Sequence, residues 1–343
     1  MKTTQPSQPG APASTAPGQA RMQAIVQHRY GTGPEEVLAL ERVATPAITA
    51  NEVLVQVRAA GVDRGTWHLM AGQPYLMRLL GFGLRGPKNP VPGLDVAGTV
   101  VATGADVSGL RAGDEVFGIA RGSFAEYAAA RADKLAHKPA GLSFEQAAAV
   151  AVSGLAALQG LRAGRIQPGQ KILVIGASGG VGSYAVQLAK VFGAEVTGVC
   201  STGKTDLVRS IGADHVIDYT QDDFADGRQR YDLILDIGGN SRLARLRRAL
   251  TPTGTLVIAG GEGAKLTGVG RQLRALMLSP FTRQRLIMYI SQHRQADLEA
   301  LRQLIEAGQV TPLIGQTYPL ADLAEAVGHL YAGHARGKIA ITI

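Results

Sequence analysis

The feature that most constrains this chain is a glycine-rich turn that joins an apolar segment to a helical pattern. Val174 and Ile175 end the apolar segment, and Gly-Ala-Ser-Gly-Gly-Val-Gly follows over residues 176–182. Glycines at such a turn let a pyrophosphate approach the backbone and bind the unpaired N–H groups at a helix N-terminus. A second strand pattern follows at residues 195–200, the spacing of a βαβ unit. The sequence therefore predicts dinucleotide binding rather than a purely structural turn.

Strand and helix patterns alternate around this turn. Strand patterns lie at residues 171–175, 195–200, 215–218, 231–237 and 255–259, and helical patterns lie at 180–191, 204–211 and 241–250. Such alternation predicts parallel strands with helices packed on the sheet. The fold class is therefore α/β, with a doubly wound parallel sheet of five strands.

The residues before this region follow a different sequence pattern. Short β-rich runs alternate with Gly and Pro turns and with almost no helical periodicity, at residues 24–28, 52–59, 97–103, 115–117 and 126–129. This pattern predicts a β-barrel or sandwich, followed by a helix over residues 143–161. At the other end we expect an amphipathic helix around 298–305, a helix over 320–331, and strands at 317–319 and 338–343. Residues 1–20 are almost all Pro, Ala, Ser, Thr, Gln and Gly, which predicts a disordered tail.

Composition narrows the classes of protein and partner. A chain of 343 residues is long enough for two domains. The single cysteine, Cys200, excludes an internal disulfide and a four-thiolate zinc site, and it favours a reducing, cytoplasmic location. No apolar run approaches about 18 residues, so we expect no stable membrane insertion. The net charge of +8 comes from arginines on separate segments, and we expect no nucleic-acid partner.

The end of the second strand bears on the choice of nicotinamide cofactor. In NAD-binding folds an acidic residue about 20 positions beyond the glycines binds the ribose hydroxyls. Here the strand ends at Cys200 and continues as Ser201-Thr202-Gly203-Lys204, with no carboxylate to repel a 2′-phosphate. Because hydroxyl and ammonium groups bind phosphate well, Ser201 and Lys204 favour NADP(H) over NAD(H). Alternatively, Ser201 caps the next helix and Lys204 is an exposed helix residue.

Several further motifs follow one another in order, and they suggest a family. They are Ala60-Gly61-Val62-Asp63, Gly93-Leu94-Asp95-Val96-Ala97-Gly98, Gly113-Asp114-Glu115-Val116-Phe117-Gly118, Phe124-Ala125-Glu126-Tyr127 and Gly337-Lys338-Ile339. With the glycine turn, they make the chain resemble the medium-chain dehydrogenase/reductase superfamily, in its zinc-independent quinone oxidoreductase-like and reticulon-interacting-protein-like branch. The resemblance covers residues 22–343.

The resemblance implies a GroES-like catalytic domain wrapped around a Rossmann domain, with substrate and nicotinamide meeting in the cleft between them. We assign residues 1–20 to the disordered tail, 21–147 to the catalytic domain, 148–285 to the Rossmann NADP-binding domain, and 286–343 to a C-terminal segment that returns to the catalytic domain. The implied cofactor contacts are Ser153, Gly154, Gly176, Ser178, Gly179, Gly180, Val181, Gly182, Ser201, Lys204, Tyr219, Gly238, Gly260 and Lys338.

The chain departs from the zinc-dependent members of this superfamily. Those relatives carry a Cys, a Gly-His-Glu triplet and another Cys where this chain has Asp63, Gly93-Leu94-Asp95 and Ala149. One carboxylate without partners makes a poor zinc site. We therefore expect neither a catalytic nor a structural zinc.

Without a metal to polarise a carbonyl, reduction of a quinone or a conjugated enone is favoured over oxidation of an alcohol, because it needs only orientation and a proton source. The candidate catalytic residues are Tyr75, Asp63 and His68. Tyr75 follows Gly72-Gln73-Pro74, one residue longer than the corresponding segment of enoyl reductases. Each has a plainer interpretation: Tyr75 packs on residues 76–82, His68 packs beside Trp67, and Asp63 orders the cleft. The apolar stretch 75–92 is a substrate-pocket lid, a membrane-leaning flap or a packed loop.

The sequence thus predicts an NADPH-dependent reductase of a small-molecule quinone or α,β-unsaturated carbonyl. The alternatives are an alcohol or aldehyde dehydrogenase with the same cofactor, and a nucleotide-binding scaffold with little turnover. We also expect a homodimer that forms through the sheet edge and the apolar segment 273–281 after the fifth strand. The alternative for this segment is burial under the C-terminal helix of the same subunit.

Overall fold

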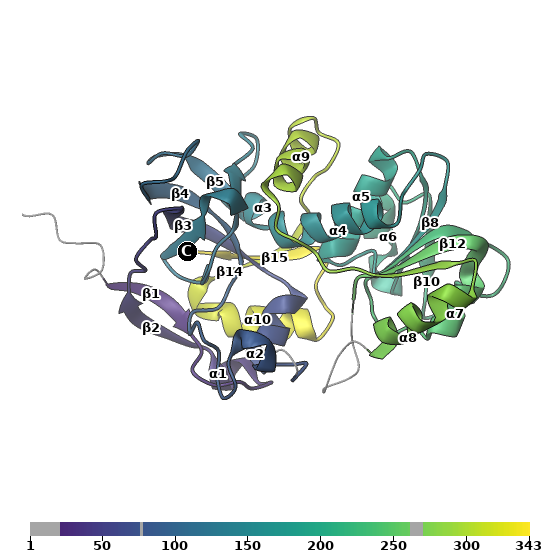
Figure 1. Ribbon diagram of the computed structural model, residues 1–343, viewed down its shortest axis with the longest axis horizontal. Helices are drawn as coiled ribbons and strands as arrows, with labels where there is room; N and C mark the ends of the chain where they lie inside the picture. Colours follow the sequence, from purple (N-terminus) through teal and green to yellow (C-terminus); the bar gives the residue numbers. More distant parts are fainter. Residues whose placement is uncertain (1–20, 76–77, 261–269) are drawn as a thin grey trace, which may run out of the picture.

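A computed structural model of the chain describes residues 21–75, 78–260 and 270–343. Two sheets dominate it, one at each end of an elongated molecule, with helices α4 (Ala151–Ala163) and α9 (Gln295–Glu306) between them (Figure 1). Phe117 from one sheet and Val174 from the other belong to the same hydrophobic core. None of the helices in the described part of the chain combines the length and the apolar run that crossing a bilayer requires.

The first sheet has six parallel strands in the order β10-β9-β8-β11-β12-β13. They are β8 (Lys171–Ile175), β9 (Glu195–Cys200), β10 (His215–Asp218), β11 (Tyr231–Asp236), β12 (Leu250–Ile258) and β13 (Arg285–Met288). The order reverses between β8 and β11, and open α/β sheets bind their ligands at the carboxyl ends of strands beside such a reversal. The strands after the glycine turn thus place their loops around it.

This sheet confirms the predicted α/β class and adds one strand. Ile172, Leu173 and Val174 are fully buried, because helices cover both faces of a parallel sheet and leave a continuous apolar run. The added strand, β13, has only four residues and begins with an arginine, so it carries too short a pattern to be found by alternation. The associated helices are α5 (Gly180–Val191), α6 (Thr205–Ser210), α7 (Leu243–Ala249) and α8 (Gly270–Leu278), with short 3-10 turns η3 (Thr202–Lys204) and η4 (Ser279–Phe281).

The second sheet has seven strands, in the order β14-β15-β3-β4-β5-β7, and β6 also pairs with β3. Its strands are β3 (Glu52–Val62), β4 (Asp95–Thr103), β5 (Glu115–Ile119), β6 (Tyr127–Arg131), β7 (Leu135–His137), β14 (Ile314–Pro319) and β15 (Lys338–Thr342). Strand β15, at the C-terminus, pairs antiparallel with β3. The end of the chain therefore completes the sheet that the N-terminal part begins, whereas the exact domain boundaries stay a prediction.

Shorter elements surround this sheet, and several were not expected. They are strands β1 (Arg21–Val26) and β2 (Ala39–Ala44), helices α1 (Pro34–Val37), α2 (Arg64–Ala71), α3 (Phe144–Ala148) and α10 (Leu323–Tyr331), the π-helix η1 (Arg78–Phe82), and the 3-10 turns η2 (Ala132–Lys134) and η5 (Leu320–Asp322). The prediction of almost no helix before residue 140 was wrong for α2, which Asp63 and Thr66 start with a reciprocal capping box. The helix predicted over 143–161 is two helices, α3 and α4, that meet at Ala149 and Val150.

The segment over residues 273–281 forms the end of α8 and the turn η4, and not a strand. Leu273, Met277 and Phe281 are exposed, so the alternative of burial under the C-terminal helix was wrong. The outermost strands of the parallel sheet are β10 and β13, and β13 is the one that follows this segment.

Candidate active site

The glycine turn between β8 and α5 has the conformation that its sequence demands. Gly176 has a φ of +88°, a region that favours glycine. A Cβ on Gly182 would lie 2.1 Å from the carbonyl oxygen of Gly176, so a side chain there would collide with backbone. Gly179 begins α5 with no side chain capping the first turn. The N–H groups of that turn are therefore open to an anion such as a pyrophosphate.

Two glycine loops lie against this turn at the carboxyl ends of β11 and β12. A Cβ on Gly176 would lie 3.2 Å from the Gly238 nitrogen, and a Cβ on Gly260 would lie 2.1 Å from the Ile237 carbonyl oxygen. The predicted residues Gly176, Gly238 and Gly260 are thus brought together from three loops. The predicted loop continues to Gly261, which lies outside the described residues.

The C-terminal strand reaches the same turn from the other sheet. Gly337, with a φ of +82°, donates its N–H to the Ser178 carbonyl oxygen at 2.8 Å and forms a parallel bridge with Gly179. A Cβ on Gly180 would lie 2.8 Å from Cδ of Lys338 and 3.0 Å from Oγ of Ser153. Ser153, Gly180 and Lys338, all predicted cofactor contacts, therefore lie together although they are far apart in sequence.

The Lys338 ammonium is engaged in a buried ion pair. Its Nζ lies 2.7 Å from Oδ2 of Asp95, and the two side chains are 1 % and 0 % exposed. The other carboxylate oxygen of Asp95 accepts the backbone N–H of Val152 at 2.7 Å. Burial, aided by the negative charge of Asp63, raises the pKa of Asp95, and Lys338 opposes this. The aliphatic stem of Lys338 lies against Gly180. We therefore interpret the predicted role of Lys338 at the cofactor as positioning of the glycine turn.

The residues after β9 form a basic corner against the C-terminal segment. Lys204 donates to the carbonyl oxygens of Gly333 and Ala335, both at 2.7 Å. Arg336 reaches back to the Gly203 carbonyl oxygen at 2.9 Å. Burial lowers the pKa of Lys204, and the nearby Arg336 lowers it further. The structure thus adds Arg336 to the predicted pair Ser201 and Lys204.

The same corner holds a carboxylate that the sequence analysis did not weigh. Asp218, at the end of β10, accepts hydrogen bonds from the hydroxyls of Thr202 and Thr220 at 2.5 and 2.8 Å. These hydrogen bonds, with that from Thr202 first, lower the pKa of Asp218. The next residue, Tyr219, donates its N–H to the Cys200 carbonyl oxygen and has an exposed side chain. Tyr219 therefore lies beside the end of β9, and its expected contact with the cofactor stays a prediction.

Gly154 and Val181 have different surroundings. A Cβ on Gly154 would lie 3.0 Å from Cδ1 of Leu301, so this glycine permits α4 and α9 to approach. Val181 is half-buried in the first turn of α5 and packs against the main core. For Gly154 the observed contact is thus one of packing, and its predicted cofactor contact stays a prediction.

The three catalytic candidates lie at or just beyond α2. Asp63 accepts the Thr66 N–H at 3.0 Å and so caps the helix. Trp67 stacks on Tyr331 and makes an edge contact with the His68 ring at 5.4 Å between centroids. Tyr75 is 39 % exposed, and the Arg78 guanidinium lies 4.8 Å from its ring centroid. Tyr75 was alternatively expected to pack on residues 76–82, of which 76–77 lie outside the described residues.

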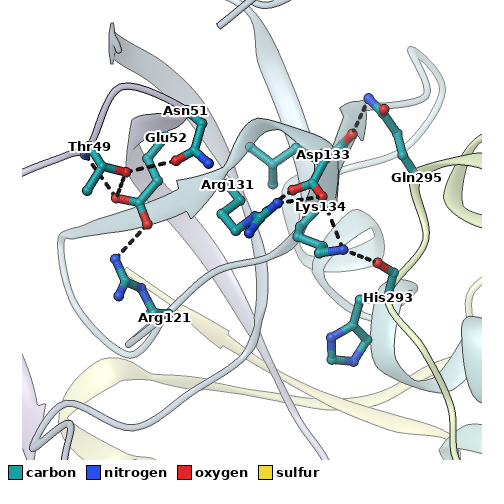
Figure 2. Close-up of polar contacts among 10 residues, drawn as sticks. Thr49, Asn51, Glu52, Arg121, Arg131, Asp133, Lys134, His293 and Gln295 are labelled. Carbon is teal, nitrogen blue, oxygen red and sulfur yellow. Dashed lines mark hydrogen bonds and ion pairs between the residues drawn. The ribbon is translucent and has the colours of Figure 1, made fainter. Parts of the chain in front are cut away.

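A histidine that sequence reasoning missed also lies near Asp63. His293 follows β13, and its carbonyl oxygen accepts Lys134 Nζ at 2.7 Å, as Figure 2 shows. Gln295 donates to the Leu135 carbonyl oxygen at 3.2 Å and anchors the same segment to the second sheet. Burial and Lys134 lower the pKa of His293, whereas the Asp63 carboxylate acts to raise it. The sequence around His293 has no motif that would have drawn attention to it.

The position occupied by zinc in zinc-dependent relatives does not offer a zinc donor set here. Leu94 and Ala149 have no side-chain ligand atoms, and the Ala149 carbonyl oxygen accepts the Tyr184 hydroxyl at 3.2 Å. Both carboxylate oxygens of Asp95 are engaged, and Asp63 caps α2. Zinc sites in proteins draw on several Cys, His or carboxylate ligands at once. These residues therefore do not fit a catalytic zinc.

Comparison with known proteins gives two family matches. Residues 49–140 match the alcohol dehydrogenase GroES-like domain, and residues 211–341 match the zinc-binding dehydrogenase family. These ranges contain most of the second sheet and the later strands of the first.

Individual relatives extend over nearly the whole chain. A 2-methylene-furan-3-one reductase of Solanum lycopersicum is 35 % identical over 324 residues, which cover 90 % of this chain and 76 % of that protein. The mitochondrial NAD(P)H oxidoreductase RTN4IP1 of Mus musculus is 31 % identical over 362 residues, covering 94 % and 89 %. Among solved structures, the quinone oxidoreductase from Coxiella burnetii has a TM-score of 0.85 at 28 % identity, covering 94 % of this chain and 100 % of that chain.

Proposed function

Because the chain belongs to the medium-chain dehydrogenase/reductase superfamily and is an oxidoreductase that uses a nicotinamide cofactor, we propose that it reduces a quinone or an α,β-unsaturated carbonyl with NADPH and without zinc. When bound, the nicotinamide supplies the hydride. The chain's own residues bind the cofactor, orient it and provide the proton. The observation that carries this proposal is the glycine turn closed against Gly337 and Lys338 of the returning strand.

The preference for NADPH is supported by charge at the basic corner. Lys204 and Arg336 flank the loop that follows β9, and Ser201 is the first residue of that loop. A 2′-phosphate placed there would receive charge-assisted hydrogen bonds, which are stronger than those between neutral groups. The Asp218 carboxylate lies in the same corner, and hydrogen bonds from threonine hydroxyls lower its pKa, so the proposal requires Lys204 and Arg336 to outweigh its repulsion of a phosphate.

The absence of a zinc requirement is supported by the side chains at Leu94 and Ala149. Negative charge that develops on a substrate oxygen or carbon then needs a hydrogen-bond donor from the protein or from water. We propose that Tyr75 serves as this donor, because its phenol carries an O–H that can donate a hydrogen bond. His68 and Asp63 are the other candidates that lie on or next to α2.

We further propose that the protein is a homodimer paired through the β13 edge of the parallel sheet. β13 is one of the two outermost strands and pairs on one side with β12, and an unpaired strand edge is a template for another strand. A cytoplasmic location remains our prediction from cysteine content, since Cys200 is a buried free thiol.

An NADPH-oxidation assay over matched panels of quinones, enones, aldehydes and alcohols tests the proposed function. We expect turnover with quinones or enones, and none of comparable rate with aldehydes or with alcohols and NADP⁺. Faster turnover of an alcohol or aldehyde would identify the dehydrogenase alternative. Tight NADPH binding without turnover of any compound would identify a nucleotide-binding scaffold.

A further inference from the structure

Arginines gather at the end of the parallel sheet that lies away from the glycine turn. Arg247 and Arg248 occupy the last turn of α7, directly before β12, and Arg283 lies two residues before the start of β13. These residues therefore lie at the amino ends of the strands. The glycine turn follows the carboxyl end of β8, so the arginines and the glycine turn lie at opposite ends of the parallel strands.

The three arginines line one hollow of about 590 Å³, together with Phe281, Gln284 and three neighbouring residues. Arg247 is held in place, because its Nε donates to Oε1 of Gln284 at 3.1 Å and its guanidinium also reaches the Thr282 hydroxyl at 3.3 Å. Arg248 and Arg283 are exposed. The hollow's described lining contains no carboxylate. Such a group of guanidiniums is suited to phosphate oxygens.

Positive charge predominates in the two segments that line the hollow. Residues 244–252 and 281–284 carry Arg245, Arg247, Arg248 and Arg283 and contain no Asp or Glu. Of these arginines, Arg245 is paired with Asp223 from outside both segments. The hollow thus presents positive charge from two elements, and it would attract a negatively charged partner.

Apolar side chains stand out next to these arginines. Phe281, which lines the hollow, is 87 % exposed, and Met277 in α8 is 73 % exposed. Leu273 and Leu276 of the same helix are also exposed. Large apolar side chains grouped on a surface mark a site of contact with another apolar phase or molecule.

We propose that this arginine surface, defined as Arg247, Arg248, Arg283, Phe281 and Met277, docks peripherally on an anionic lipid bilayer. Guanidiniums bind headgroup phosphates, and Phe281 and Met277 enter the boundary between headgroups and acyl chains, which is how basic amphipathic surfaces bind membranes. A nucleic acid would use the arginines, and a base could stack on Phe281, but Met277 would be left without an apolar partner. A second copy related by a two-fold axis would bring like charges together.

This proposal goes beyond the proposed function and does not depend on it. Docking at the amino ends of the parallel strands leaves the glycine turn and the basic corner uncovered. The β13 edge, which the proposed dimer uses, contributes no residue to the hollow lining among the described residues. The apolar segment 273–281, which the sequence analysis assigned to the dimer interface, carries Met277 and Phe281. In this proposal that segment contacts lipid, and the dimer uses the strand edge alone.

Vesicle flotation with the full chain tests the proposal. We expect binding to vesicles of phosphatidylcholine with phosphatidylglycerol, weak binding to phosphatidylcholine alone, and release by high salt. Reversing two charges with Arg248→Glu/Arg283→Glu should weaken the partition coefficient at least about 30-fold, since each basic side chain near an anionic surface contributes about 1 kcal/mol. Phe281→Ser should weaken it about tenfold, the scale of partial burial of one aromatic side chain.

A matched control carries the same charge change elsewhere: Arg42→Glu/Arg111→Glu alters two exposed arginines in the other half of the molecule. We expect this control to bind anionic vesicles within about twofold of the parent.

Equal losses in the two double variants, or no vesicle binding by the parent, would overturn the proposal. A change of oligomeric mass in Phe281→Ser would instead identify a self-interface, and tight binding of an oligonucleotide unaffected by Phe281→Ser would identify a nucleic-acid surface. NADPH turnover of a water-soluble substrate should stay at the parental rate in every variant, which separates this test from that of the proposed function.

Discussion

Replacing Lys338 by Met should strongly destabilise the protein, because it leaves Asp95 buried without its counter-charge. The methionine keeps most of the aliphatic stem that lies against Gly180, so packing at the glycine turn changes little. What is lost is the ammonium 2.7 Å from a carboxylate that is fully buried. Removing one partner of a buried ion pair typically costs about 3 to 5 kcal/mol in the free energy of unfolding. We expect a loss in that range by urea unfolding at about pH 8.

The loss should depend on pH in a definite direction. Burial already raises the pKa of Asp95, and Lys338 is the main group that opposes this. Without Lys338, the folded-state pKa of Asp95 rises further above its unfolded value of about 4. A carboxyl whose pKa is raised by folding costs no stability below the unfolded pKa, and its cost grows as pH rises toward the folded-state pKa. The deficit of Lys338→Met should therefore be smaller at about pH 5 than at about pH 8.

Two further variants make this prediction decisive. In Lys338→Met/Asp95→Asn, the amide oxygen still accepts the Val152 N–H and no charge is buried, so the double variant should be more stable than Lys338→Met alone by about 2 kcal/mol. The control is Lys190→Met, which breaks a surface pair with Asp214 and should cost less than about 1 kcal/mol. If Lys338→Met lies within about 1 kcal/mol of the parent, or if the double variant is no more stable than the single, our account of this pair is refuted.

Four other outcomes are expected. Arg336→Ala or Lys204→Ala should weaken NADPH binding by about 1.5 to 3 kcal/mol in calorimetric titration while hardly changing that of NADH, and equal losses for both cofactors would contradict the assignment of the basic corner. Tyr75→Phe should lower enone turnover at least about 100-fold with unchanged cofactor affinity, and quinone turnover less, whereas a change within about twofold would mean that Tyr75 only packs. Gly182→Ala should abolish cofactor binding, measured by NADPH fluorescence, because its Cβ would lie 2.1 Å from the Gly176 carbonyl oxygen. Elemental analysis should find no stoichiometric zinc, and one tightly bound zinc per chain would overturn the ligand argument.

Local patterns predicted much of the fold correctly. The strands at Lys171–Ile175, Glu195–Cys200 and His215–Asp218 and the helix at Gly180–Val191 have the bounds that their patterns indicated. Each is a run long enough, or sufficiently marked by flanking glycines, for periodicity to be read directly. Strand β13 and helix α2 were missed because one is very short and the other depends on a capping box that resembles a turn.

The features of the candidate site also fall into two groups, those that the sequence determined and those that only the tertiary structure decided. The sequence by itself determined the glycine turn, since backbone conformation and close approach are requirements of single positions such as Gly176 and Gly182. It also determined the missing zinc ligands, because Leu94 and Ala149 lack donor atoms in any fold. Only the tertiary structure decided that Lys338 pairs with Asp95 across 243 residues of sequence. Which charged groups meet is set by the packing of distant elements, and no local pattern records that packing.

The same reasoning applies to the basic corner and to the arginine surface. The sequence shows a lysine after the second strand, but the carbonyl oxygens of Gly333 and Ala335 orient it, and Arg336 joins it only because β15 returns to the glycine turn. Likewise, the sequence shows many arginines on separate segments. The parallel sheet brings the end of α7 and the end of η4 together at the amino ends of β12 and β13. Periodicity and turn chemistry act within a few residues, whereas side-chain burial and charge pairing depend on contacts that exist only once the sheets have formed.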